Sequence, residues 1–207
     1  MPLFLLQFTK SKTPQKISLN CHRYPNPLFS IPMIQYFTLP GYGNSPAQHW
    51  QTHFEQQLSN CRRINQKRWT GVTCDDWTSE IEKTLKDLDT SETILITHSL
   101  GGIALAHWAA KHPKKIKGAM IVAPPDIDNP YMDLSLQSFA PIPLQPLPFP
   151  SVVVASTNDL WTSMDRYKFF AESWGSKLVS IGDAGHINVH SGYGRWDEGL
   201  EILKTLV

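Results

Sequence analysis

The stretch from Thr93 to Trp108 restricts the fold more than any other part of this sequence. It begins with the apolar, β-branched run Thr93–Thr97, which is typical of a buried strand. After Gly102 the sequence is rich in Ala, Leu and Ile, which favours a helix that stops at Pro113. Ser99 lies between the two, where the chain must turn sharply. A strand, a tight turn carrying Ser and a helix predict a nucleophile elbow, in which the turn lifts the Ser hydroxyl out of the sheet.

The residues around Ser99 support this interpretation but depart from the usual pattern at one position. The local sequence is Thr97-His98-Ser99-Leu100-Gly101, whereas the usual elbow has Gly two residues before the Ser as well as two after it. The positions two residues before and two residues after the Ser fold against neighbouring elements, so small side chains suit them. We expect Gly101 to be a structural part of the elbow for this reason, and His98 to pack within it. The plainer alternative is a Ser that caps the following helix.

A glycine-containing loop follows the first convincing strand, Ile34–Leu39. It runs from Pro40 to Pro46, and its glycines allow tight backbone geometry. A loop at this place builds half of the oxyanion hole in folds with a nucleophile elbow. We expect the backbone N–H groups of Leu100 and Tyr42 to be the two donors. An ordinary strand-to-helix turn is the alternative.

Segments with the periodicity of strands and helices alternate along the chain, which predicts a parallel sheet with helices on both faces. The strands are expected at Ile34–Leu39, Cys61–Asn65, Thr93–Thr97, Gly118–Ala123, Ser151–Ala155 and Leu178–Ile181. The helices are expected at Trp50–Leu58, at Trp77–Leu88, after Gly102, at Asp165–Trp174 and at Trp196–Leu206. Ser45 is the expected cap of the first helix, and Asp75 or Asp76 that of the second.

The segment from Pro124 to Pro150 contains eight prolines, a density that excludes regular secondary structure. We interpret it as a loop over the strand ends. It either lines a pocket or only covers the core. The apolar residues that could line such a pocket are Leu134, Phe139, Leu144, Leu147 and Phe149.

Three polar residues follow three predicted strands, in the order Ser99, Asp159 and His186. Functional groups gather at the carboxyl ends of parallel strands. A nucleophilic Ser needs a base, and the base needs an orienting carboxylate, so we expect these three residues to form a catalytic triad. The order Ser, acid, His is that of α/β-hydrolases. Asp126 and Asp183 are the alternative acids, although each is less well placed.

The sequence shows no sign of a metal or cofactor. His186 and His190 have the spacing of helical zinc ligands, but the Glu of that motif is missing between them and the context is a loop. The formal net charge of +1 gives no electrostatic signature of nucleic-acid binding. No apolar run is long enough to cross a membrane. Cys21, Cys61 and Cys74 are widely spaced, which indicates free thiols in a reducing compartment and predicts a cytoplasmic protein.

The first 32 residues differ in composition from the rest, because they contain no Asp or Glu and are rich in Pro. We expect residues 1–32 to be an irregular extension, either ahead of a true start at Met33 or as a targeting segment. Residues 33–207 are then expected to form a single α/β domain.

Four separated motifs of this sequence resemble the small serine hydrolases of the retinoblastoma-binding protein 9 and YdeN type. They are Leu39–Pro46 with Trp50, the Thr97–Gly101 elbow, Ala155–Asp159 and Gly182–Trp196. The resemblance covers about residues 33–207 and is stronger to the bacterial branch. It implies an α/β-hydrolase with a mostly parallel central sheet, helices on both faces and no large cap domain. It also implies Ser99, Asp159 and His186 as the triad. The Leu-x-Cys-x-Glu motif of retinoblastoma-protein binding is absent, so that partner is not expected.

The leading hypothesis is therefore a serine hydrolase that acts on a small ester, thioester or amide through an acyl-enzyme on Ser99. Two other hypotheses remain. One is a non-catalytic binding protein that keeps the fold and uses the Pro124–Pro150 surface. The other is an acyltransferase that uses the same triad with an acceptor other than water.

Overall fold

The computed structural model of this protein describes residues 33–207, and the predicted extension at residues 1–32 lies outside the described part. Six strands form one sheet in the order β2-β1-β3-β4-β5-β6. Every neighbouring pair is parallel, as the alternation of strands and helices predicted. The strands are β1 Gln35–Leu39, β2 Cys61–Arg63, β3 Thr93–His98, β4 Gly118–Val122, β5 Ser151–Ala155 and β6 Lys177–Ser180.

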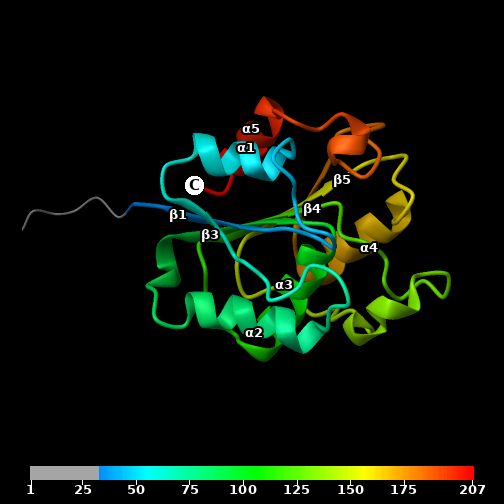
Figure 1. The fold of residues 1–207 in the computed structure, drawn as a ribbon, viewed down its shortest axis with the longest axis horizontal. Coiled ribbons are helices and arrows are strands. Elements are labelled where there is room, and N and C mark those ends of the chain that lie inside the picture. The colour runs from blue at the N-terminus through cyan, green and yellow to red at the C-terminus, as the bar shows by residue number, and fades with distance from the viewer. Residues whose placement is uncertain (1–32) are drawn as a thin grey trace, which may run out of the picture. The chain divides into compact units, whose positions relative to one another are not determined.

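Helices cover both faces of the sheet, as Figure 1 shows with the sheet seen nearly edge-on. One face carries α1 and α5, and the other carries α2 and α3, with α4 packed on the same core as α2 and α3. The helices are α1 Trp50–Gln57, α2 Cys74–Leu85, α3 Leu100–Lys111, α4 Met164–Trp174 and α5 Asp197–Lys204. Short 3-10 helices occur at Thr90–Glu92, Leu134–Phe139 and Val189–Ser191.

Alternate residues of the strands supply the two apolar cores. In β3, Leu95 faces the core under α2, α3 and α4, whereas Ile94 and Ile96 face the core under α1 and α5. All six residues of β3 are buried, because the strand is central and covered on both sides. Burial on both faces explains why this strand consists largely of apolar, β-branched residues, the composition from which it was predicted. The central strand therefore holds its C-terminal end, and Ser99 after it, in a rigid position.

Two predicted helix caps are wrong. The first helix is capped by His49, whose ring accepts the N–H of Gln51, because residues after Ser45 form a turn before the helix begins at Trp50. The second helix is capped by Thr73, whose side chain accepts the N–H of Asp76. Asp75 and Asp76 instead occupy the first turn, where their negative charge interacts favourably with the helix dipole.

The proline-rich segment is not wholly irregular, because Leu134–Phe139 forms a 3-10 helix. A 3-10 helix needs few consecutive hydrogen bonds, and no proline falls within this run. Phe139 and Phe149 are buried and anchor the segment to the core beside α2, α3 and α4. Leu134 is exposed. The segment therefore covers the core through part of its length.

Cys61 and Cys74 are both free thiols, as expected, and Cys21 lies outside the described residues. Burial raises the pKa of Cys61 to about 12 and that of Cys74 to about 11, which keeps both in the unreactive thiol form. In the described residues no helix combines the length and apolar character that crossing a bilayer requires. The cytoplasmic location stays a prediction.

Candidate active site

Ser99 occupies a sharp backbone turn between β3 and α3. Its φ of 52° and ψ of −129° lie in a region that residues with a side chain rarely adopt. The Ser99 N–H donates to the Val122 carbonyl at 2.9 Å, which fixes the turn to the end of β4. The Ser99 side chain makes no capping bond to α3, so the alternative of a simple helix cap is wrong. The turn instead leaves the hydroxyl available to a partner outside the helix.

Glycine is required at the elbow because other backbone segments approach it closely. A Cβ at Gly101 would lie 2.3 Å from the Leu39 carbonyl oxygen, and one at Gly41 would lie 2.7 Å from Ser99 Cβ. A Cβ at Gly102 would lie 2.8 Å from a side-chain carbon of Ile121. The glycine loop after β1 therefore lies directly against the turn that carries Ser99.

Thr97 replaces the usual glycine without disturbing this packing. Its side chain is fully buried, and its hydroxyl lies 3.4 Å from the Met120 carbonyl oxygen. A Cβ at Gly102 would lie only 3.3 Å from the Thr97 hydroxyl. The missing side chain of Gly102 thus provides the space that Thr97 uses, and the departure from the usual pattern is compensated locally.

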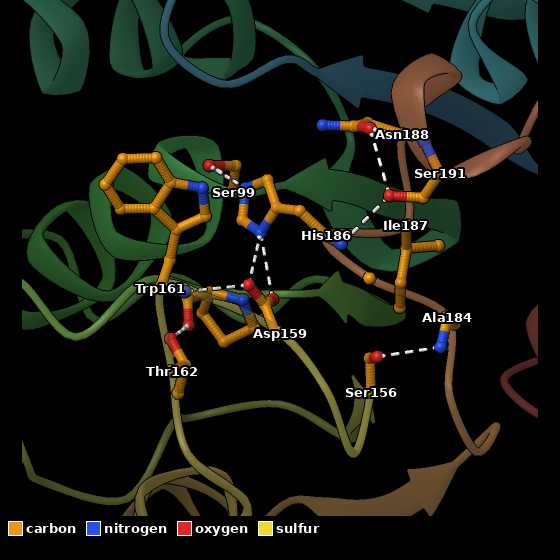
Figure 2. A network of polar contacts seen from close by, with 12 residues as sticks. Ser99, Ser156, Asp159, Trp161, Thr162, Ala184, His186, Ile187, Asn188 and Ser191 are labelled. Atoms are coloured by element: carbon orange, nitrogen blue, oxygen red, sulfur yellow. Dashed lines mark hydrogen bonds and ion pairs between the residues drawn. The ribbon is translucent and has the colours of Figure 1, made fainter.

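The structure brings Ser99, His186 and Asp159 together in one chain of hydrogen bonds (Figure 2). His186 Nε2 lies 2.8 Å from Ser99 Oγ. His186 Nδ1 lies 2.9 Å from Asp159 Oδ2 and 3.1 Å from Asp159 Oδ1. The Asp159 side chain is fully buried, whereas that of His186 is 13% exposed. This geometry suits the transfer of a proton from the Ser99 hydroxyl to the imidazole.

The two alternative acids have other partners. Asp126 forms an ion pair with Arg166 at 2.7 Å, and Asp183 accepts a hydrogen bond from the Thr157 hydroxyl. Asp159 is the carboxylate that contacts the His186 imidazole. Its Oδ1 also accepts the backbone N–H of Trp161 at 2.9 Å.

Side-chain hydrogen bonds tie the loop after β5 to the loop after β6. The Ser156 hydroxyl accepts the Ala184 N–H at 2.9 Å, and Asn158 Oδ1 accepts the Gly185 N–H at 2.7 Å. Figure 2 shows the first of these bonds and also the Ser191 hydroxyl, which accepts the His186 N–H at 3.1 Å. These bonds hold the loops of Asp159 and His186 in fixed positions relative to each other.

Two further histidines lie beside the imidazole of His186, and burial keeps both neutral. Burial lowers the pKa of His98 well below its ordinary value. Burial, assisted by the charge of Arg63, lowers the pKa of His49 to about 3. His98 Nε2 lies 2.9 Å from the His186 carbonyl oxygen, so the neutral ring must carry its proton on Nε2 and donate it. His98 is therefore more than elbow packing, because it also holds the backbone of His186.

The two predicted oxyanion donors flank Ser99. Leu100 is the first residue of α3 and is buried, and Tyr42 lies in the glycine loop, where it lines the pocket. Within residues 33–207, neither the Tyr42 N–H nor the Leu100 N–H has a hydrogen-bond acceptor. Both donors are thus available to a substrate oxygen, and their role stays a prediction.

A pocket of about 560 Å³ opens beside Ser99 and His186. Its walls are mainly apolar and come from the glycine loop, the segment after β4, the loop after β5 and the loop after β6. None of the lining side chains in this described part is Lys or Arg, and Asp133 is the carboxylate among them. The apolar lining residues are Tyr42, Pro46, Leu100, Pro125, Met132, Leu136, Trp161 and Val189.

The proline-rich segment lines this pocket, but through residues that the sequence did not identify. Pro125, Met132 and Leu136 are in the wall, whereas none of the five predicted candidates is among the lining residues. Trp161 was also missed, and its indole lies 6.3 Å from the His186 ring, centre to centre. An apolar residue in an irregular loop has no periodicity, so no signal in the sequence separates a wall residue from a core residue. Among the described residues, no cluster of three or more His, Cys, Asp or Glu side chains could hold a metal ion.

Comparisons with known proteins find a matching family and similar folds. The profile of the serine hydrolase family matches residues 36–205. A YdeN-like hydrolase from Pectobacterium atrosepticum is 33% identical, with 84% of this chain and 93% of that chain covered and a TM-score of 0.73. The YdeN protein of B. subtilis is 18% identical, with 84% and 98% covered and a TM-score of 0.71.

More distant structures share the fold alone. Est1E from Butyrivibrio proteoclasticus, solved with bound ferulic acid, is 16% identical, with 76% of this chain and 83% of that chain covered and a TM-score of 0.59. A comparison with curated protein sequences finds no match.

Proposed function

The chain belongs to the serine hydrolase family, within the α/β-hydrolase superfamily, and we propose that it cleaves a small ester, thioester or amide through an acyl-enzyme on Ser99. The observation that carries this proposal is the continuous contact from Ser99 Oγ through His186 to Asp159, with 2.8 Å at one ring nitrogen and 2.9 Å at the other. A Ser in an ordinary turn does not require contact with an imidazole that is itself oriented by a buried carboxylate, whereas a nucleophilic Ser does.

The reaction proceeds in two halves. Ser99 Oγ attacks the acyl carbon while His186 Nε2 takes its proton, and the resulting imidazolium is stabilised by Asp159. His186 then gives that proton to the leaving group, which departs as an alcohol, thiol or amine. In the second half His186 takes a proton from water, the hydroxide attacks the acyl carbon, and Ser99 regains its proton as the acid is released.

The negative charge that develops on the acyl oxygen is held by the N–H groups of Leu100 and Tyr42. Both lack another acceptor in the described structure, and both flank Ser99. Leu100 is also at the N-terminus of α3, where the helix dipole favours negative charge. Preorganised donors of this kind contribute roughly 3–4 kcal/mol each to transition-state stabilisation.

The pocket favours an uncharged acyl group. Its walls are mainly apolar, and no Lys or Arg among the lining residues offers a positive charge to an anionic substrate. Desolvating a carboxylate or phosphate against such walls costs free energy that no partner offsets. The volume of about 560 Å³ is sufficient for a small-molecule ester.

The test is labelling by a fluorophosphonate probe together with hydrolysis of p-nitrophenyl esters of increasing chain length. The wild type should be labelled, and Ser99→Ala should not be. Its kcat should fall on the order of 10⁴- to 10⁶-fold if the triad acts as a unit. Ser59→Ala, at an exposed position, is the matched control and should retain both labelling and activity. Equal labelling of wild type and Ser99→Ala would overturn the proposal.

Two other outcomes correspond to the rival functions. A protein that is folded, unreactive toward the probe and inactive on the ester panel would be a binding protein. A protein that forms the acyl-enzyme but yields more ester or amide than acid when an alcohol or amine is added would be an acyltransferase. Product analysis by mass spectrometry separates these outcomes.

A further inference from the structure

A buried tyrosine from α4 contacts the carboxylate of Asp159. Tyr167 is fully buried, and its hydroxyl donates to Asp159 Oδ2 at 2.5 Å. This is the oxygen that lies nearer to His186 Nδ1. Together with the Trp161 N–H on Oδ1, the carboxylate therefore has one donor from the loop, one from α4 and one from the imidazole.

We propose that Tyr167 is a positioning residue that fixes the Asp159 carboxylate against His186 and limits how strongly that carboxylate supports the imidazolium. This inference rests on the proposed function of Ser99, His186 and Asp159 as a triad. Tyr167 does not line the pocket, so it acts on the reaction through Asp159 and not on the substrate.

The position of Tyr167 on a helix makes it a rigid support. Its N–H bonds to the Ser163 carbonyl in the first turn of α4, and its ring belongs to the core shared by α2, α3 and α4. The backbone N–H of Trp161 holds Oδ1 from the loop itself. Tyr167 holds the other oxygen from α4, a separate element, and hydrogen bonds at both oxygens oppose rotation of the carboxylate about its own axis.

Tyr167 remains a donor throughout the working range of a hydrolase. Burial, followed by the negative charge of Asp159 and their hydrogen bond, raises the pKa of Tyr167 far above its ordinary value. The phenol therefore keeps its proton. The neutral phenol can therefore donate to the buried Asp159 carboxylate across that pH range, and the hydrogen bond between them is retained.

The hydrogen bond from Tyr167 has two opposite effects on the proton relay. It holds Oδ2 at the distance from Nδ1 that orients the imidazole, which favours catalysis. It also draws negative charge toward the phenol, which weakens the attraction between Asp159 and a protonated imidazole. Removal of the hydroxyl should therefore lower kcat and make the imidazole hold its proton to a higher pH.

Few other ionisable groups contribute to this pH dependence. Asp159 is faced by Tyr167 from α4 and by His186 from the loop after β6. His186 is faced by Asp159, by His98 at the end of β3 and by His49 before α1, and burial keeps those two histidines neutral. His190, in the same loop as His186, also lines the pocket. The Tyr167 hydroxyl donates to Asp159 and to none of these other histidines, so its removal acts on the pH dependence through Asp159.

The experiment compares Tyr167→Phe with the wild type in the pH dependence of kcat and of kcat/KM on a p-nitrophenyl ester. Phe keeps the ring and its packing, so only the hydroxyl is lost. We expect kcat to fall about tenfold with KM within about twofold. We expect the acidic limb of kcat/KM to move upward by about half a pH unit or more. Tyr36→Phe is the matched control, because Tyr36 lies near the start of β1, away from the carboxyl ends of the strands.

An acidic limb that stays at the wild-type position would overturn the proposal, even if kcat falls, because a purely structural role does not move it. Fluorophosphonate labelling separates this failure from failure of the proposed function. A labelled Tyr167→Phe with an unchanged limb removes only the role of Tyr167, whereas an unlabelled wild type removes the triad itself. The thermal melting temperature of each variant is measured alongside, so that a loss of folded protein is distinguished from the loss of the hydrogen bond.

Discussion

The turn that carries Ser99 is held by backbone packing, whereas the loops that carry Asp159 and His186 are held by side-chain hydrogen bonds. At the elbow, Gly101 lies against the Leu39 carbonyl so closely that no side chain fits between them. By contrast, Ser156 and Asn158 each use a single polar atom to join the loop after β5 to the loop after β6. The position of Ser99 and the positions of Asp159 and His186 therefore depend on different physical forces.

This difference predicts opposite responses to substitution. A methyl group added at a glycine of the elbow displaces the backbone and should lower the free energy of unfolding. Loss of a polar atom in the loops that carry Asp159 and His186 leaves the packing unchanged and should lower kcat before it lowers stability. Measurements of kcat and of the free energy of unfolding, for variants of the Ser99 turn and of the two loops, test this difference.

Asp159→Asn should show the largest effect. The isosteric amide keeps the packing but cannot stabilise the imidazolium, so kcat should fall on the order of 10⁴-fold while the protein stays folded. Steady-state kinetics and circular dichroism measure the two effects. Asp183→Asn is the matched control, because Asp183 contacts the Thr157 hydroxyl and not His186. A loss of similar size in Asp183→Asn would instead make Asp183 the acid.

Gly101→Ala, in the turn that carries Ser99, should show the next largest effect. Its Cβ would lie 2.3 Å from the Leu39 carbonyl oxygen, so the backbone must move, and the free energy of unfolding should fall by roughly 2–4 kcal/mol. Gly175→Ala is the control, because a Cβ there meets no atom within 4 Å and only its φ of 66° is unfavourable. That variant should lose about 1 kcal/mol. Urea unfolding measures both, and equal losses would contradict the role of close packing.

Asn158→Ala should show the smallest effect. It removes the acceptor of the Gly185 N–H, one residue before His186, and so loosens the loop that carries the base. We expect kcat to fall about tenfold with little change in melting temperature. The exposed Asn65→Ala is the control. A large drop in stability without a drop in kcat would show that this bond serves folding and not the relay.

The same difference explains how much the sequence could predict. The alternation of strands and helices predicted the parallel sheet, because each element follows a period set by its own backbone. The position of Ser99 at the end of β3 was predictable for a related reason, since a buried strand, a glycine pair and a helix are all local signals. The predicted meeting of Asp159 with His186 relied on the rule that functional groups lie at strand ends.

Contacts between distant loops were not predictable. Tyr167 has the appearance of a core residue of a helix, and nothing in the sequence indicates that its hydroxyl reaches Asp159. His98 supports the His186 carbonyl, a bond between residues 88 positions apart in the chain. The predicted helix caps were also wrong, because Ser45, Asp75 and Asp76 all fit the preference for a cap, whereas the path of the loop places His49 and Thr73 at the cap positions.

One wall of the pocket, formed by Pro125, Met132 and Leu136, belongs to the segment between β4 and β5, which contributes no strand to the sheet. Its anchors in the core are Ile127, Met132, Phe139, Ile142 and Phe149. Between these anchors, Asp133 and Leu136 line the pocket without being fully buried. Substitutions at these two positions can therefore reshape the wall without shifting the register of any strand, and a mutant library confined to them is the economical way to alter which small molecule the pocket accepts.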